Sequence, residues 1–273
     1  FWRSSTRRLG VLRALPWWTM VGSAVRAQSH EVPAAHHDGP PLYGKLMSAI
    51  ASGHTWGNRV RMLKLPLLFS EDILYAGAIT QFYFLTAALE QALHRHQAHP
   101  MVDKVLGLGI VALPGYESDL SELYGTDWRT KAEVQKTPAT AAYIKKLETA
   151  GPVELVAAAF ILYGALVVGG GKMTQAKVRK VFPQCEHRLF DIKDDIKLAR
   201  QQFKATFTHI GKEFPEHFEA LTSEAARFMA LNNTVVLSIR CWGRRARRTT
   251  AALSVAGLVV LLAMATRRWR VRQ

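Results

Sequence analysis

A long apolar stretch near the middle of the chain, Pro152–Met173, sets the strongest limit on the fold. It reads PVELVAAAFILYGALVVGGGKM and carries no charge between Glu154 and Lys172. Its length is close to that of a membrane-spanning helix, which needs about 20 apolar residues. Its many small residues instead favour close packing against another helix or a flat ligand. Because glycine costs about 1 kcal/mol inside a helix, we expect a buried helix that bends at Gly164 or at the glycine triplet 169–171.

This stretch resembles the distal helix of the heme oxygenase family, whose pattern is roughly L-V-A-H-A-Y-x-R-Y-L-G-D-L-S-G-G-Q. The two sequences align without a gap, and Phe160 stands where the family has Tyr. Seven positions are identical: Leu155, Val156, Ala157, Ala159, Tyr163, Gly169 and Gly170.

The departures from the pattern remove the polar side chains of the family's distal site. Ala158 stands at the family's His, Leu162 at its Arg, Ala165 at the first distal glycine and Leu166 at the catalytic Asp. A leucine cannot order water as that carboxylate does. The resemblance therefore implies the family's fold without its catalytic residue.

Further segments resemble the same family in the same order along the chain. They predict an all-α, heme oxygenase-like helical bundle with helices over residues 42–65 and 72–96. The matching segments are LMSAIASGHTWGNRVRML (46–63), YESDLSELYGTDW (116–128), TPATAAYIKKLETAG (137–151) and SEAARFMALN (223–232). We expect only loop and helix over 174–200.

The resemblance also indicates which residues would contact heme if heme is bound. His54 falls on the proximal iron ligand, and Asn58 stands at the Glu that lies near that ligand in the family. A neutral imidazole is a good iron ligand when a neighbouring acceptor fixes its other nitrogen. Five further positions would surround the heme: Phe160, Gly169, Gly170, Met229 and Asn232.

The family's clamp for the heme carboxylates is weakened in this chain. Its Lys and Arg fall near Gln201 and Ala205, and Lys204 or Lys197 would substitute if the gap differs. We therefore expect that the protein binds no cofactor. Heme is the one cofactor that the sequence leaves possible.

The formal charge of +15 belongs to the ends of the chain. Residues 1–28 carry five Arg and residues 240–273 carry nine, with no acid in either, so the middle holds 22 basic and 21 acidic side chains. A nucleic-acid-binding domain would show its basic patch on the folded part. We expect no nucleic-acid partner.

Three regions follow from these patterns. Residues 1–41 form a basic arm and linker whose Arg-rich, acid-free start is typical of mitochondrial targeting. Residues 42–239 form the helical domain. Residues 240–273 carry an uncharged segment, Thr249–Ala265, between Arg clusters. Its 17 residues would span about 26 Å as a helix, close to a bilayer core of roughly 30 Å, which predicts a C-terminal transmembrane helix.

The cysteines and clustered histidines predict no metal site. Cys185 and Cys241 are too few for a disulfide framework and lack metal-site spacing, which indicates reduced thiols. His94, His96 and His99 could bind zinc, but favourable placement of positive charge at a helix C-terminus explains them more simply. Paired Glu-x-x-His motifs of a di-metal oxidase are not found.

Two functions remain open. The first is a catalytically degenerate heme oxygenase-like protein, anchored in the mitochondrial inner membrane through lipid contacts of Thr249–Ala265. It would act as a structural or accessory subunit bound to other subunits of a respiratory complex. The alternative is an active heme oxygenase, cleaving heme to biliverdin, CO and iron, or a heme-binding protein that uses His54. A different activity on the same scaffold is a weaker third possibility, since fold alone does not determine function.

Overall fold

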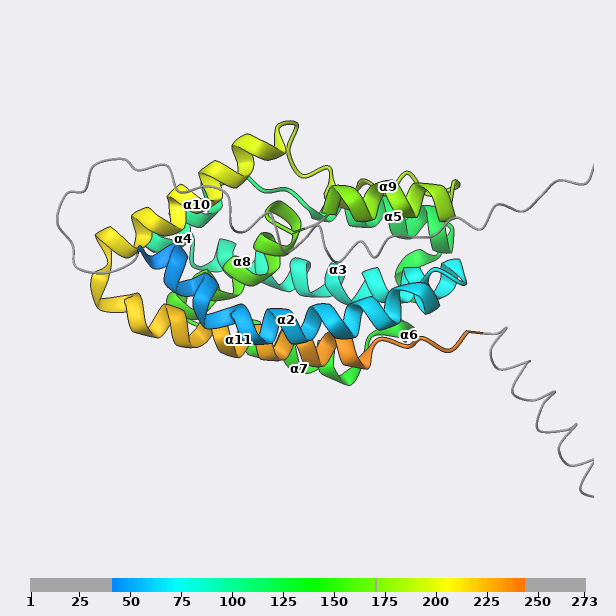
Figure 1. Ribbon diagram of the computed structural model, residues 1–273, viewed down its shortest axis with the longest axis horizontal. Coiled ribbons are helices and arrows are strands. Elements are labelled where there is room, and N and C mark those ends of the chain that lie inside the picture. The colour runs from blue at the N-terminus through cyan, green and yellow to red at the C-terminus, as the bar shows by residue number, and fades with distance from the viewer. Residues whose placement is uncertain (1–40, 170, 244–273) are drawn as a thin grey trace, which may run out of the picture. The chain divides into compact units, whose positions relative to one another are not determined.

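The computed structural model describes residues 41–169 and 171–243, and this part of the chain is helical without strands (Figure 1). The N-terminal arm and the segment Thr249–Ala265 lie outside the described residues. The helices are α2 (Leu42–Leu68), α3 (Asp72–Arg95), α4 (Pro100–Leu106), α5 (Leu113–Tyr124), α6 (Trp128–Gln135), α7 (Pro138–Glu148), α8 (Pro152–Val167), α9 (Gly171–Val181), η1 (Arg188–Phe190), α10 (Ile196–Glu213), η2 (Pro215–His217) and α11 (Phe218–Ser238). The all-α fold predicted from the sequence is confirmed.

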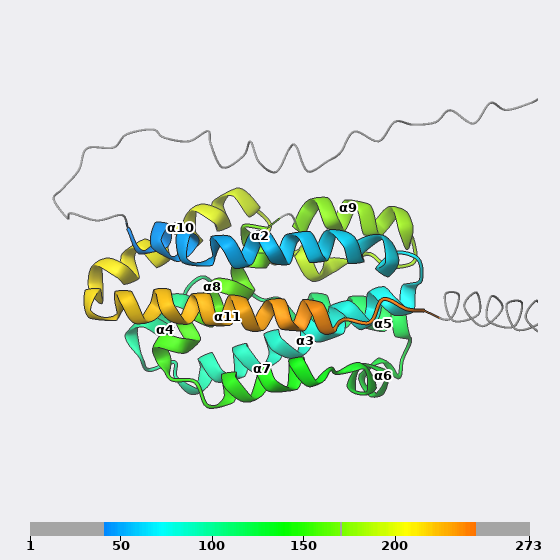
Figure 2. The ribbon, with the colours of Figure 1, turned by 60° about the horizontal axis from the view of Figure 1, so that its bottom comes forward.

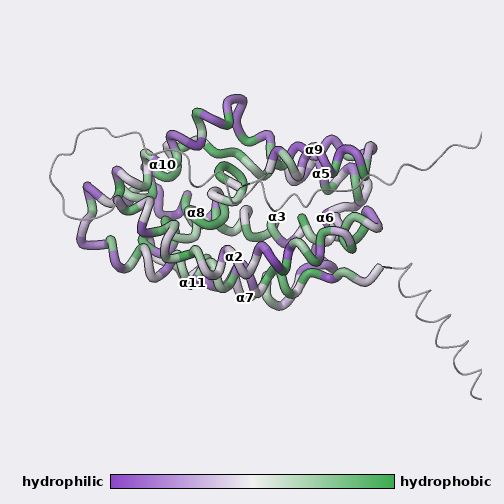
Figure 3. The backbone as a smooth tube through the Cα atoms, in the orientation of Figure 1, coloured by the Kyte–Doolittle hydropathy of each residue, from purple (hydrophilic) through white to green (hydrophobic). Residues whose placement is uncertain are grey.

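The apolar helix α8 occupies the core of the bundle. It packs against α3, α4, α10 and α11, and eleven of its 16 residues are buried. Figure 3 shows most of α8 in the hydrophobic colour. A helix that is apolar on every side must be enclosed on every side, so the position of α8 follows from its sequence.

The stretch 152–173 forms two helices and not one bent helix. α8 ends at Val167, and its axis differs from that of α9 by 54°. At Gly169 a Cβ would lie 2.3 Å from the Ala165 carbonyl oxygen, and at Gly171 it would lie 2.4 Å from the Phe190 ring. These two glycines are therefore required by close packing at the break. The predicted change of direction is found at the glycine triplet 169–171. Gly164, the other predicted position, lies within the continuous helix α8.

α2 and α11 run side by side along the bundle (Figures 1 and 2). Gly53 and Gly57 allow this close approach, because a Cβ at Gly53 would lie 2.9 Å from Met229 Cγ and one at Gly57 would lie 2.1 Å from Asn233 Oδ1. Asn233 Nδ2 also donates a hydrogen bond to the Gly53 carbonyl, at 2.9 Å. The pair is thus held by small residues and by interhelical hydrogen bonds, which include those from Lys64 Nζ to the Val236 and Leu237 carbonyls.

One helix of the described part, α3, is long and apolar enough to cross a membrane. Within its most apolar window, 56% of the residues are buried inside the bundle, as in the core helix of a folded domain. α8 and α9 meet the same criterion only as a bent pair. The described helices therefore give only weak evidence for a membrane span.

Substitutions at two glycines of α2 should have opposite effects. Gly57→Ala should lower the free energy of unfolding by about 1–3 kcal/mol, the usual cost of overpacking, because the new methyl group displaces Asn233 from Gly53. Gly44→Ala is the matched control: nothing lies within 4 Å of its Cβ position, so it should be neutral or stabilise by about 0.5–1 kcal/mol. Denaturant unfolding measures both, and equal effects would contradict this account of the α2–α11 contact.

Candidate functional site

His54 lies next to the buried face of α2, one position after Gly53 and three before Gly57. The buried positions of α2 form one stripe, and His54 is exposed outside it. Tyr43, three turns earlier on the same side, meets Phe160 of α8 edge to face, with ring centroids 5.9 Å apart. His54 is therefore on the side of α2 that is turned toward α8.

Two neighbours determine which nitrogen of His54 carries the proton. The Arg61 guanidinium donates to Asn58 Oδ1, so Asn58 presents its amide Nδ2 to His54 Nδ1, 3.4 Å away. An amide nitrogen only donates, so this contact favours the tautomer in which Nδ1 accepts and the proton of the neutral ring lies on Nε2. Iron binding through Nε2 would then require the other tautomer.

The pKa of His54 is lowered by partial burial and, secondly, by the positive charge of Arg61. The imidazole reaches solvent, yet the surrounding protein removes enough hydration to disfavour its charged form. It is therefore neutral at neutral pH, with the proton on Nε2.

The distal side is hydrocarbon at the positions where the family has polar groups. Ala158, Leu162 and Leu166 are all buried, with 0%, 5% and 6% of their surfaces exposed. Ala165 is the exposed residue on this part of α8, and the Cβ position of Gly164 lies 3.5 Å from the Phe203 ring. At these three positions α8 presents no side chain that could donate a proton or order water.

Phe160 contributes to packing between helices. Its ring lies 5.8 Å from that of Phe203 and 5.0 Å from that of Phe207, both on α10, measured between centroids. With Tyr43 these rings join α2, α8 and α10. The rings of this aromatic cluster pack around Phe160, which is one of the residues predicted to contact heme.

The other predicted heme contacts lie on α11 and at the end of α8. Met229 is buried against Gly53, while Asn232 is half-buried and the neighbouring Asn233 makes the bond to α2. Gly169 is half-buried at the end of α8, and Gly170 lies outside the described residues. Sequence reasoning missed Gly53 and Asn233, although the G-x-x-x-G spacing of α2 is a signal of close helix contact.

The positions of the expected carboxylate clamp lie along α10. Gln201, Ala205, Lys197 and Lys204 are all exposed. The adjacent Arg200 donates from Nε to the carbonyl oxygen of Val167, at 2.9 Å. A cation at a helix C-terminus is stabilising, so Arg200 supports the end of α8.

The histidines 94, 96 and 99 do not form a metal-binding group. Among the described residues, one set of three potential ligands comes together, and it consists of Asp119, Cys185 and His187. Both cysteines are free thiols, as predicted. The sequence signal for this set is a Cys-x-His spacing, which is weak without a neighbouring partner in the chain.

Comparison with known proteins settles the family. The family model described as "Heme oxygenase" matches residues 42–237. The chain belongs to the heme oxygenase family. It is 29% identical over 133 residues to heme oxygenase 1 of Nostoc sp., and 29% identical over 108 residues to the heme oxygenase of Rhodella violacea. These alignments cover 47% and 37% of the chain, and only 55% and 45% of the two relatives, about half of their length.

Solved structures of this family share the fold. Heme oxygenase 2 from Chlamydomonas reinhardtii, solved without heme, superimposes with a TM-score of 0.68 and 26% identity, covering 74% of this chain and 99% of that one. Heme oxygenase-1 from the cyanobacterium Synechocystis sp., in complex with heme, gives a TM-score of 0.63 and 20% identity, covering 82% and 100%. At that lower identity the likeness shows the fold alone.

Glu90 of α3 is an acidic group inside this family fold that lacks an ion pair. Its Oε1 is buried without a hydrogen-bond partner among the described residues. Burial raises the pKa of Glu90 to about 7, against a smaller lowering by the Ala112 backbone amide. The pKa of Tyr163 on α8 is raised mainly by burial of that tyrosine and, to a smaller extent, by the negative charge of Glu90.

Stability should therefore fall as pH rises through neutrality. Because the folded-state pKa of Glu90 is raised above its unfolded value of about 4.3, its contribution is complete below pH 4.3 and is lost as pH rises through about 7. Glu90→Gln should remove on the order of 1–2 kcal/mol of that loss between pH 5 and pH 8. Denaturant unfolding at both pH values measures it, with the exposed Glu148→Gln as control; equal pH slopes in wild type and Glu90→Gln would refute the assignment.

Proposed function

We propose that this protein is a catalytically degenerate member of the heme oxygenase family that acts as a membrane-anchored structural or accessory subunit. The observation that carries the proposal is the buried Leu166 at the position of the family's catalytic Asp. Heme cleavage in this family needs an ordered water chain that delivers a proton. A buried leucine, with Ala158 and Leu162 beside it on α8, cannot provide one.

The proximal side supports the same proposal. Iron binding by His54 requires a free nitrogen lone pair, and the Asn58 amide beside Nδ1 favours the tautomer with the proton on Nε2. Arg61 holds Asn58 in that orientation. Ligation would therefore require a tautomer change and the loss of this contact.

The proposed cellular location rests on the composition of the N-terminal and C-terminal segments. The acid-free, Arg-rich start is typical of mitochondrial targeting, and Thr249–Ala265 has the length of a short membrane span between Arg clusters. Together they favour the mitochondrial inner membrane, with lipids around the anchor and other subunits of a respiratory complex as partners. The near-neutral middle of the chain favours protein partners over nucleic acid.

An active heme oxygenase or a heme-binding protein is the alternative. One observation favours it: His54 remains exposed on the face of α2 that is turned toward α8. The fold match to a cyanobacterial enzyme in complex with heme is compatible with it. If heme binds here, it supplies the iron on which oxygen is activated. His54 would hold the iron, whereas Leu166, at the position of the family's Asp, could not hold a proton.

Hemin titration of the full-length protein in mild detergent distinguishes the two functions. We expect no saturable Soret band that depends on His54, and no biliverdin after addition of a reductant and oxygen. His54→Ala is the test variant, and His94→Ala, at an exposed position of α3, is the control. A stoichiometric band lost only in His54→Ala, together with biliverdin formation, would establish the alternative.

Membrane attachment is tested separately. The wild-type protein should stay in the membrane pellet after alkaline extraction and migrate in a large complex on native gels. Val259→Arg should release it, because a charge at the centre of a span costs about 2.5–3.5 kcal/mol or more. Val134→Arg changes an exposed residue of α6 and should not. Extraction of the wild-type protein as a free monomer would contradict the proposed role.

A further inference from the structure

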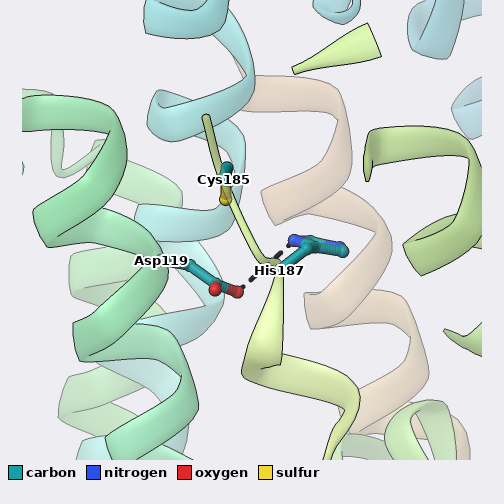
Figure 4. Close-up of side chains that lie close together, drawn as sticks. All are labelled: Asp119, Cys185 and His187. Atoms are coloured by element: carbon teal, nitrogen blue, oxygen red, sulfur yellow. Dashed lines mark ion pairs between the residues drawn. The ribbon is translucent and has the colours of Figure 1, made fainter. Parts of the chain in front are cut away.

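A buried polar cluster lies outside the heme region, between α5 and the segment that joins α9 to η1. Asp119 comes from α5, and Cys185 and His187 come from the connecting segment. One potential ligand atom from each lies within 4.8 Å of the others, and all three residues are buried. Figure 4 shows the carboxylate, the sulfur and a ring nitrogen directed toward a common space.

The ring of His187 is oriented by two partners. Nδ1 lies 3.3 Å from Asp119 Oδ2. The Tyr75 hydroxyl lies 2.8 Å from Nε2 and 3.3 Å from Nδ1. In metal sites, a ligating histidine almost always uses its other nitrogen in a hydrogen bond that fixes the ring. Tyr75 can provide that bond at Nε2, which leaves Nδ1 on the side of Asp119 and Cys185.

The backbone at His187 is held in an unfavourable conformation. His187 is the one non-glycine residue with positive φ in the described chain, at 55°. Left-handed backbone costs a residue with a Cβ about 1–2 kcal/mol, and such strain concentrates at functional sites. Gln175 Nε2 donates to the His187 carbonyl at 2.7 Å and holds it there.

Asp119 holds the next two residues of this segment. Its Oδ1 accepts from the Arg188 amide at 2.6 Å, and its Oδ2 accepts from the Leu189 amide at 2.9 Å. The carboxylate is completely buried. A buried carboxylate normally has an opposite charge or a metal beside it, and the His187 Nδ1 next to Oδ2 is itself a potential metal ligand.

We propose that Asp119, Cys185 and His187 bind a zinc ion that joins α5 to the segment between α9 and η1. Zinc takes thiolate sulfur, imidazole nitrogen and carboxylate oxygen in closed, four-coordinate structural sites. These three residues would supply three of the four ligands, and Glu122, one turn after Asp119, lies beside them, where its carboxylate interacts with the Cys185 thiol. Its Oε2 also accepts from the Glu186 amide in the same segment, at 2.8 Å.

Zinc binding would balance the charges of the site. The thiol of Cys185 would lose its proton to solvent and become a thiolate, because the thiolate is the form that binds metal. The thiolate and the Asp119 carboxylate together then match the two charges of the cation. This site is independent of heme binding at His54.

Cobalt substitution tests the site in the full-length protein. After treatment with a chelator, one equivalent of Co²⁺ should produce a thiolate-to-cobalt charge-transfer band together with the d–d bands of tetrahedral cobalt, and zinc should displace both. Cys185→Ala should abolish the charge-transfer band. Cys241→Ala, at the half-buried cysteine outside the cluster, should leave it unchanged.

Two further variants separate metal binding from folding. His187→Gly accommodates the positive φ but removes a buried, hydrogen-bonded ring, so it should lower the melting temperature of the metal-free protein, keep its helical circular dichroism and abolish the tetrahedral spectrum. Tyr75→Phe should weaken Co²⁺ affinity by about 10- to 100-fold, as expected for loss of a bond that orients a ligand. Absence of a charge-transfer band in the wild-type protein, or a band that persists in both Cys185→Ala and His187→Gly, would overturn the proposal.

Discussion

The enclosure of α8 is the constraint on which the rest of this structure depends. The helix is apolar on every side, so most of its surface must be buried. α3, α4, α10 and α11 surround it, and the aromatic cluster around Phe160 extends the same core to α2. The other elements are arranged to exclude water from this helix.

Close backbone approach is the second requirement, and glycines provide it at two places. Gly53 and Gly57 bring α2 against α11, while Gly169 and Gly171 allow the chain to turn after α8. Arg200 then supports the end of α8 through the Val167 carbonyl. These contacts determine which face of α2 is left turned toward α8, and so where His54 lies.

The polar chemistry of the bundle lies away from its distal helix. α8 carries hydrocarbon at 158, 162 and 166, yet the same fold buries a connected set of polar groups from Tyr75 through His187 to Asp119. Under the proposed function, the family scaffold is retained although the distal positions carry no polar group.

The sequence by itself determined the helical class, the family and the absence of an acidic residue at position 166. Helix boundaries near Leu42 and Arg95 could be predicted because apolar side chains repeat with the period of the helix. Only the tertiary structure decided which nitrogen of His54 is protonated, and that Cys185 lies beside Asp119. The reason is physical: such pairings depend on the orientation of side chains from packed segments distant in the sequence, and no local periodicity encodes that orientation.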